Sequence, residues 1–168
     1  KQIEILTKLE GNIDPDLFET KIVRETLKSF YVMKTIQDEN GETGCHRYII
    51  SNTQSSKNMF EVYALARICG WKLDEMTFDI VPLLETVEDL DNGEEILGYM
   101  YNHPDYTKHL KARGKRQYVM LGFSDGTKDG GYLKANWSIF TAKENLSGIS
   151  KKNRVKIIFF DGRGGPPA

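Results

Sequence analysis

The sequence predicts an α/β fold in which parallel strands alternate with helices, about half of a (β/α)8 TIM barrel. Four short segments have the length and the apolar or β-branched composition of strands: residues 47–52, 78–84, 118–121 and 155–160. Helical periodicity separates each consecutive pair, and this alternation is typical of a parallel sheet with right-handed crossovers. Polar residues follow each strand where it ends, and in parallel α/β folds that edge of the sheet carries the chemistry.

The N-terminal part of the chain is expected to be helical. Apolar residues within residues 1–9 favour a short helix over an edge strand. Asp14 is a favourable N-cap and Pro15 suits the first position of a helix. We therefore expect a second helix that begins there, runs to about Asp38 and stops before Gly41.

Two helices are expected to connect the first three strands. Ser55 can cap the first of them, and Gly70 closes it. Thr86 can cap the second, which Asn92 and the glycine after it would interrupt. Residues 102–115 are polar and contain Pro104 and Gly114, so we expect a loop on the side far from the strand ends.

A long helix is expected between the third and fourth strands. Its apolar residues predict one face that packs on the sheet: Leu133, Trp137, Phe140, Leu146 and Ile149. We also expect Cys69 and Trp71, which lie earlier in the chain, to be core residues. The three histidines are expected at the surface rather than as ligands or bases: His46, His103 and His109.

Composition excludes several classes of protein. The chain has 168 residues and a formal net charge of −1, which is enough for one domain with a real core. The balanced charge gives no argument for nucleic acid or a membrane surface as partner. The two cysteines make no disulfide framework, no apolar run is long enough to span a bilayer, and no signal peptide is visible. We therefore expect a cytoplasmic protein.

The predicted elements form a single α/β segment over residues 1–168. Residues 1–45 form its N-terminal helical region, and residues 46–168 hold the four strands with their helices. A complete (β/α)8 barrel needs about 250 residues, so four strands make half of one, although an open parallel sheet also fits. Because the chain begins at Lys1 rather than Met and ends in a glycine-rich stretch, we expect a segment of a larger catalytic barrel.

Candidate site residues follow the carboxyl ends of the strands. Glu85 follows the second strand and Asp125 the third, so their carboxylates would lie close together and could hold Mg²⁺ or Mn²⁺. Lys128 and Arg163 add positive charge suited to phosphate or carboxylate. Ser124, next to Asp125, is a further candidate for binding substrate. This combination suggests chemistry on a phosphorylated or carboxylated small molecule.

A simpler interpretation accounts for the same residues. Asp and Ser at strand ends often only cap the next helix, and this could explain both Glu85 and Asp125. Asp129 is expected to cap its own helix. Lys128 by itself would be an ordinary solvated loop lysine, and glycine-rich stretches such as residues 162–165 are more often turns than phosphate loops.

Four segments together resemble one enzyme family, the phosphoenolpyruvate carboxylases. The run VMLGFSDGTKDGGYLKANWSIFTAKENL resembles the central motif of the family. Three other runs resemble its further segments, in the order of the family: YIISNTQSSKNMFEVYALAR, VPLLETVEDL and FFDGRGGPPA. The resemblance extends from about Tyr48 to the end and leaves the first 45 residues unassigned.

This resemblance implies a large barrel enzyme, usually a homotetramer, that joins phosphoenolpyruvate to bicarbonate and releases oxaloacetate and phosphate. Such a lyase fixes carbon for the tricarboxylic acid cycle. The implied metal ligands are Glu85 and Asp125, with Mg²⁺ or Mn²⁺ as cofactor, and the implied active-site cations are Lys128 and Arg163. Asp161 departs from the histidine that is usual in the family.

The family's essential histidine lies upstream of this segment. The 168 residues alone are therefore expected to fold and to associate through an exposed sheet face, but not to catalyse without the rest of their own chain. Two alternatives stay open: another metal-dependent barrel enzyme that acts on phosphoenolpyruvate or pyruvate, and a non-enzymatic α/β binding module.

Overall fold

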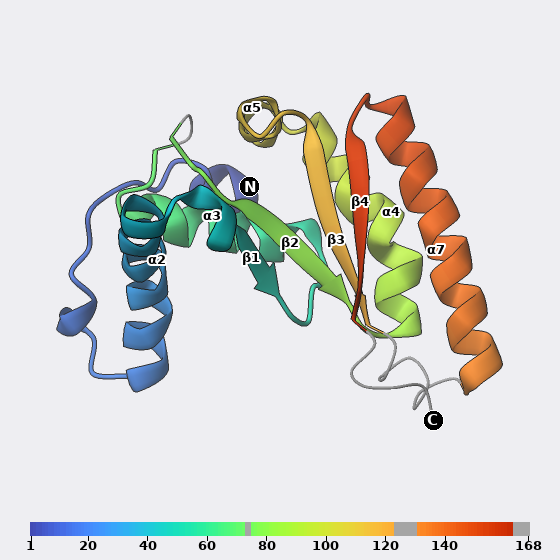
Figure 1. Ribbon diagram of the computed structural model, residues 1–168, viewed down its shortest axis with the longest axis horizontal. Coiled ribbons are helices and arrows are strands. Elements are labelled where there is room, and N and C mark those ends of the chain that lie inside the picture. Colours follow the sequence, from blue (N-terminus) through green and yellow to red (C-terminus); the bar gives the residue numbers. More distant parts are fainter. Residues whose placement is uncertain (73–74, 123–130, 163–168) are drawn as a thin grey trace.

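The computed structural model describes residues 1–72, 75–122 and 131–162. Its elements are α1 (Gln2–Leu6), the 3₁₀ turn η1 (Pro15–Leu17), α2 (Lys21–Asn40), the 3₁₀ turn η2 (Glu42–Gly44), β1 (Arg47–Ile50), α3 (Ser56–Ile68), β2 (Asp79–Leu84), α4 (Val87–Asn102), α5 (Pro104–Ala112), β3 (Arg116–Gly122), α7 (Tyr132–Lys152) and β4 (Lys156–Gly162). The strands form one parallel sheet in the order β1-β2-β3-β4 (Figure 1). The predicted α/β alternation is confirmed, and the arrangement is consistent with part of a (β/α)8 barrel.

Helices cover one face of this sheet and leave the other face open. α4 and α7 lie side by side along β3 and β4 (Figure 1). Val119 and Leu121 point into this layer and are at most 1% exposed. Met120, which pairs with Phe160, lies on the opposite face, where Phe160 is 53% and Ile49 is 44% exposed. No described helix covers this open face, which exposes Ile49 and Phe160 but buries Val81 and Tyr118.

The first long helix begins later than predicted. Asp14 does act as a cap, but only for the short turn η1, whose backbone becomes extended at Phe18. The extended backbone ends that turn, and α2 begins anew at Lys21. Its end agrees with the prediction, because Asn40 is the last residue and Gly41 follows with a φ of 82°. The short helix predicted within residues 1–9 is confirmed as α1.

The predicted break at Asn92 is wrong, because α4 continues through it. A Cβ atom placed on Gly93 would lie 2.9 Å from Cδ1 of Leu84 and 3.3 Å from Cδ2 of Leu146. The glycine therefore serves close packing of α4 against β2 and α7 rather than a turn. Thr86 caps this helix as predicted, since its side chain accepts from the backbone N–H of Asp89 at 3.1 Å.

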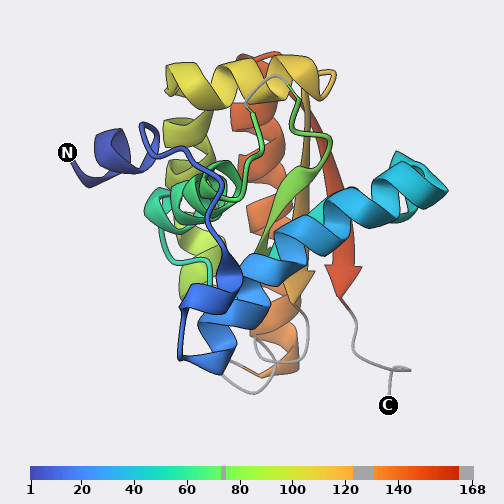
Figure 2. The same ribbon diagram turned by 90° about the vertical axis from the view of Figure 1, so that its left-hand side faces the viewer.

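The loop predicted for residues 102–115 is mostly the helix α5, which starts with Pro104 at its first position. It does lie far from the strand ends as predicted, at the end of the sheet opposite to the tip of β4 (Figure 2). His109 of this helix is only 1% exposed, so its predicted surface position is wrong. Burial lowers the pKa of His109 from 6.5 to about 4, and the nearby carboxylate of Asp79 offsets this only in part.

The face of α7 that packs inward is not wholly the predicted one. Leu133, Trp137 and Phe140 point outward and are 82%, 68% and 54% exposed. The buried face is instead Ala135, Ile139, Ala142, Leu146 and Ser150. Small alanine side chains let α7 approach its neighbours closely, and this packing selects the face. The core positions predicted for Cys69 and Trp71 are confirmed.

A buried polar network joins the elements at the amino end of the sheet. Arg113, just after α5, forms an ion pair with Asp79 of β2 at 3.0 Å and another with Glu42 of η2 at 2.7 Å. The side chains of Arg113 and Asp79 are 7% and 4% exposed. These contacts tie three segments that are distant in sequence.

β2 and β3 pair only through two residue pairs at their carboxyl ends. Toward their amino ends the side chain of Gln117 fills the space between them. Its Nε2 donates to the carbonyl oxygen of Ile80 at 3.1 Å, and its Oε1 accepts from the hydroxyl of Tyr106 at 2.6 Å. The strands are therefore closest to each other at their carboxyl ends.

None of the described helices combines the length and the apolar character needed to cross a membrane.

Candidate active site at the carboxyl edge of the sheet

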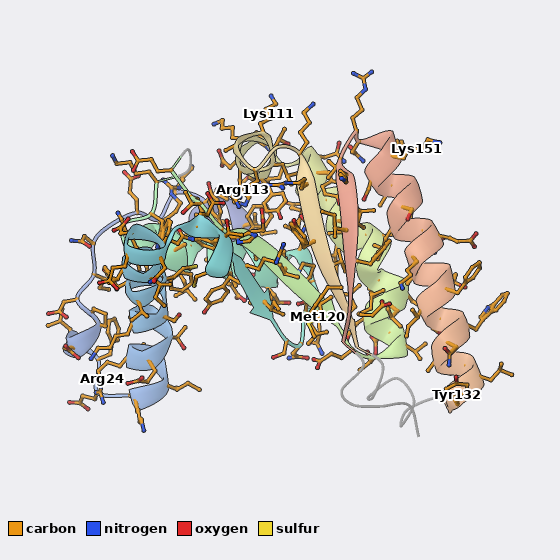
Figure 3. The ribbon with its side chains drawn as sticks, viewed as in Figure 1. Arg24, Lys111, Arg113, Met120, Tyr132 and Lys151 are labelled. Atoms are coloured by element: carbon orange, nitrogen blue, oxygen red, sulfur yellow. The ribbon has the colours of Figure 1, made fainter. Side chains whose placement is uncertain are left out.

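The carboxyl ends of the strands meet at one edge. Leu84 pairs with Leu121, and Gly122 pairs with Gly162, so β2, β3 and β4 end side by side. Figure 3 shows two residues at this end of the molecule: Met120 near the end of β3 and Tyr132 at the start of α7. Lys111, Arg113 and Lys151 lie toward the opposite end. Glu85, the residue after β2, is the predicted metal ligand that the structure places at this edge.

The backbone at Glu85 is held by the cap of α4. The carboxylate of Asp89 accepts hydrogen bonds from the backbone N–H of Glu85 at 3.2 Å and of Thr86 at 3.0 Å. Thr86 and Asp89 thus form the capping box of the helix between them. The alternative in which Glu85 serves only as a helix cap is therefore wrong.

The side chain of Glu85 instead reaches the end of β1. Its Oε2 accepts from the backbone N–H of Asn52 at 3.1 Å. Asn52 adopts a left-handed backbone with a φ of 53°, a conformation that asparagine tolerates better than most residues. The turn after β1 thus directs an amide at the half-buried carboxylate of the next strand.

The end of β3 lies against the other side of this glutamate. A Cβ atom placed on Gly122 would lie 3.1 Å from Cα of Glu85 and 3.3 Å from its Cγ. The absence of a side chain at this position lets the two strand ends approach. Sequence reasoning missed both Asn52 as a hydrogen-bond donor and Gly122 as a neighbour, because an asparagine or a glycine after a strand usually indicates only a turn.

Asp161, near the end of β4, is turned toward the helical layer. It pairs in register with Leu121, which is buried on the helix side of the sheet. Its Oδ1 lies 2.8 Å from Nζ of Lys143 of α7. Asp161, where the family that the sequence resembles usually has a histidine, thus forms an ion pair with α7.

The remaining predicted site residues lie outside the described residues: Ser124, Asp125, Lys128, Asp129 and Arg163. The proximity of Glu85 to Asp125 therefore stays a prediction. Within residues 1–72, 75–122 and 131–162, no group of three or more His, Cys, Asp or Glu side chains is arranged to hold a metal ion. Of the two predicted metal ligands, Glu85 is the one that lies among the described residues.

Residues 4–166 match the family model described as "PEPcase: Phosphoenolpyruvate carboxylase". The chain belongs to the phosphoenolpyruvate carboxylase family. The match includes most of the N-terminal helical region, residues 1–45, which none of the four motifs covers.

Three similar relatives are each named "Phosphoenolpyruvate carboxylase". The relative from Gloeobacter violaceus is 37% identical over 144 residues, which are 84% of this chain and 15% of the relative. The relative from Synechococcus sp. is 37% identical over 147 residues, 84% of this chain and 14% of the relative. The relative from Prochlorococcus marinus is 38% identical over 154 residues, 87% of this chain and 16% of the relative. The chain thus spans about 15% of the length of the curated relatives that it matches.

Proposed function

We propose that this chain supplies one side of the active site of an enzyme that carboxylates phosphoenolpyruvate with bicarbonate and releases oxaloacetate and phosphate. The observation that carries the proposal is the placement of Glu85. Its carboxylate lies at the carboxyl edge of a parallel sheet, outside the helix cap, where barrel enzymes carry their chemistry. The names of the relatives support the choice of reaction.

Glu85 would hold Mg²⁺ or Mn²⁺ together with Asp125. Both ions prefer hard oxygen ligands such as carboxylates. Among the described residues Glu85 accepts one hydrogen bond, through Oε2, so its carboxylate keeps lone pairs that could bind a cation. This environment fits a metal-binding carboxylate. The bound ion would stabilise the negative charge that develops on the substrate oxygen.

The cationic residues would act on the phosphate. In the reaction, the phosphoryl group would move from the enol oxygen of phosphoenolpyruvate to an oxygen of bicarbonate, which forms carboxyphosphate and leaves the enolate of pyruvate. The carbon–oxygen bond of carboxyphosphate would then break, so that inorganic phosphate leaves with the bicarbonate oxygen and C3 of the enolate bonds to the bicarbonate carbon. Lys128 and Arg163 would orient the phosphoryl group and balance its charge, and Ser124 would donate a hydrogen bond to the substrate. These side chains would stabilise the transition state more strongly than they stabilise the bound reactants.

The rest of the enzyme would come from further parts of the polypeptide. The open sheet face, where Ile49 and Phe160 are exposed, would be covered by the remaining barrel, and a homotetramer in the cytoplasm is the proposed assembly. An open site cannot exclude water. We therefore propose that the 168 residues alone are inactive.

The experiment is a bicarbonate-dependent assay of oxaloacetate with the complete enzyme and with the 168-residue chain. We expect activity only from the complete enzyme. Glu85→Gln should lower its kcat/KM at limiting Mg²⁺ by at least about 10²-fold, in line with the loss of an electrostatic catalytic group. The matched control is Glu88→Gln, an exposed change three residues further along, which should leave the activity unchanged.

Two results would contradict the proposal. Phosphate release that does not depend on bicarbonate would favour another barrel enzyme that acts on phosphoenolpyruvate. Full activity of Glu85→Gln would remove this residue from the metal site.

A further inference from the structure

We propose that Gly122 is a positioning residue for Glu85: its missing side chain sets where the metal-binding carboxylate can lie. This inference rests on the proposed function, because it concerns the same carboxylate. It assigns a role to a residue that touches neither metal nor substrate.

Glu85 is restrained on two sides before Gly122 is considered. Its backbone N–H is fixed by the carboxylate of Asp89 at 3.2 Å, and its Oε2 accepts from the N–H of Asn52 at 3.1 Å. One contact comes from α4 and the other from the turn after β1. The glutamate therefore has little freedom to move toward either element.

Gly122 forms the third side. A Cβ atom there would lie 3.1 Å from Cα of Glu85, 3.3 Å from its Cγ and 3.4 Å from the carbonyl oxygen of Leu84. Two of these three atoms are backbone, which cannot rotate away as a side chain can. An alanine at this position would thus have to displace the strand end or the base of the glutamate side chain by a few tenths of an ångström.

Backbone conformation does not require glycine at this position. Gly122 is not among the glycines with a positive φ, unlike Gly41, Gly70, Gly114 and Gly131. Alanine could therefore adopt the same backbone, and only the space against Glu85 opposes it. Gly162, its partner in register, is crowded by other residues, because an added Cβ there would lie 2.6 Å from the flexible Cε of Met120 and 3.3 Å from the carbonyl oxygen of Leu121.

Small displacements of a ligand matter at a hard-cation site. Metal–oxygen distances must be kept within about 0.2 Å for a good site, and changes in the residues that orient a ligand commonly weaken metal binding 10- to 100-fold. A shift of Cα and Cγ moves the carboxylate at the end of the side chain. Gly122→Ala should therefore weaken metal binding without altering any ligand.

The test is a direct Mn²⁺ titration of the complete enzyme in the absence of substrate, with circular dichroism as the check on folding. We expect Gly122→Ala to weaken Mn²⁺ binding about tenfold. Gly148→Ala is the matched control, because a Cβ atom there would have no neighbour within 4 Å, and its affinity should equal that of the parent.

A double-mutant cycle separates positioning from a general structural effect. In the Glu85→Gln background, Gly122→Ala should cause no further loss of Mn²⁺ affinity, because the carboxylate on which it acts is absent. An additional tenfold loss there, or unchanged affinity of the single variant Gly122→Ala, would overturn the inference. If Glu85→Gln itself leaves Mn²⁺ binding unchanged, the proposed metal site fails, and with it the premise of the inference.

Discussion

The amino and carboxyl ends of the sheet use charged residues in opposite ways. At the amino end, Asp79 and Arg113 are almost fully buried, and Arg113 also contacts Glu42. At the carboxyl end, Glu85 is half-buried and accepts a single hydrogen bond among the described residues, with Gly122 as its close neighbour. The first arrangement saturates its charges with one another, whereas the second leaves a carboxylate with capacity for further ligands.

This difference indicates that the two ends of the sheet have different roles. Buried charges that are fully paired hold elements in one arrangement, and removing one partner is strongly destabilising. A carboxylate near solvent contributes little to stability but can bind an ion. The amino end therefore serves the fold, and the carboxyl end serves the proposed chemistry.

The strongest test of this comparison is Arg113→Met in the 168-residue chain. Because the change leaves the buried carboxylate of Asp79 without its cation, we expect a loss of about 3–5 kcal/mol in the free energy of unfolding. Urea denaturation measures it. Lys111→Met, an exposed change on the preceding helical turn, should stay within about 0.5 kcal/mol of the parent.

A second variant protects the test against a protein that fails to fold. Replacing both partners, as in Asp79→Leu with Arg113→Met, should recover part of the stability because no unpaired charge remains. A loss below about 1 kcal/mol for Arg113→Met alone would show that the amino end is not the structural end of the sheet.

The next effect is a pH dependence that arises from His109, which lies near Asp79 and Arg113. Its folded pKa of about 4 is below its ordinary value of 6.5, so between these values the unfolded chain binds a proton that the folded chain does not. The free energy of unfolding should therefore fall as the pH drops from 6.5 to 4, by about 3 kcal/mol in total.

Carboxylates also titrate in this pH range and contribute to the stability of any variant. The contribution of His109 is therefore measured as the difference in stability between the parent and His109→Phe. Denaturation at several pH values should show that the difference in stability between the two proteins changes by about this amount. An identical pH dependence of both proteins would mean that the buried imidazole does not titrate as its position indicates.

The smallest effect is expected at the carboxyl end. Glu85→Gln keeps an acceptor for the N–H of Asn52, so the free energy of unfolding of the 168-residue chain should change by less than about 0.5 kcal/mol. Urea denaturation of Glu85→Gln and Arg113→Met under the same conditions compares the loss of stability at the two ends of the sheet. A loss above about 2 kcal/mol would assign Glu85 a structural role and weaken the contrast between the two ends.

Local patterns in the sequence were sufficient to predict much of the fold and the position of Glu85 at the edge of the sheet. The alternation of strands and helices, the cap at Thr86 and the helix end at Gly41 all depend on residues within a few positions of one another. Placement of Glu85 at the carboxyl edge followed from the same alternation, because parallel strands end on the same side. The motifs also predicted the family to which the chain belongs.

The tertiary structure decided the features that depend on which surfaces meet. Trp137 and Phe140 are apolar but exposed, because the smaller face with Ala135 and Ala142 packs more closely. His109 is polar but buried, because α5 closes over the amino end of the sheet. The contacts of Asn52 and Gly122 with Glu85 join residues more than thirty positions apart. The sequence alone carries no local pattern for such contacts, because they exist only once β1, β2 and β3 have paired.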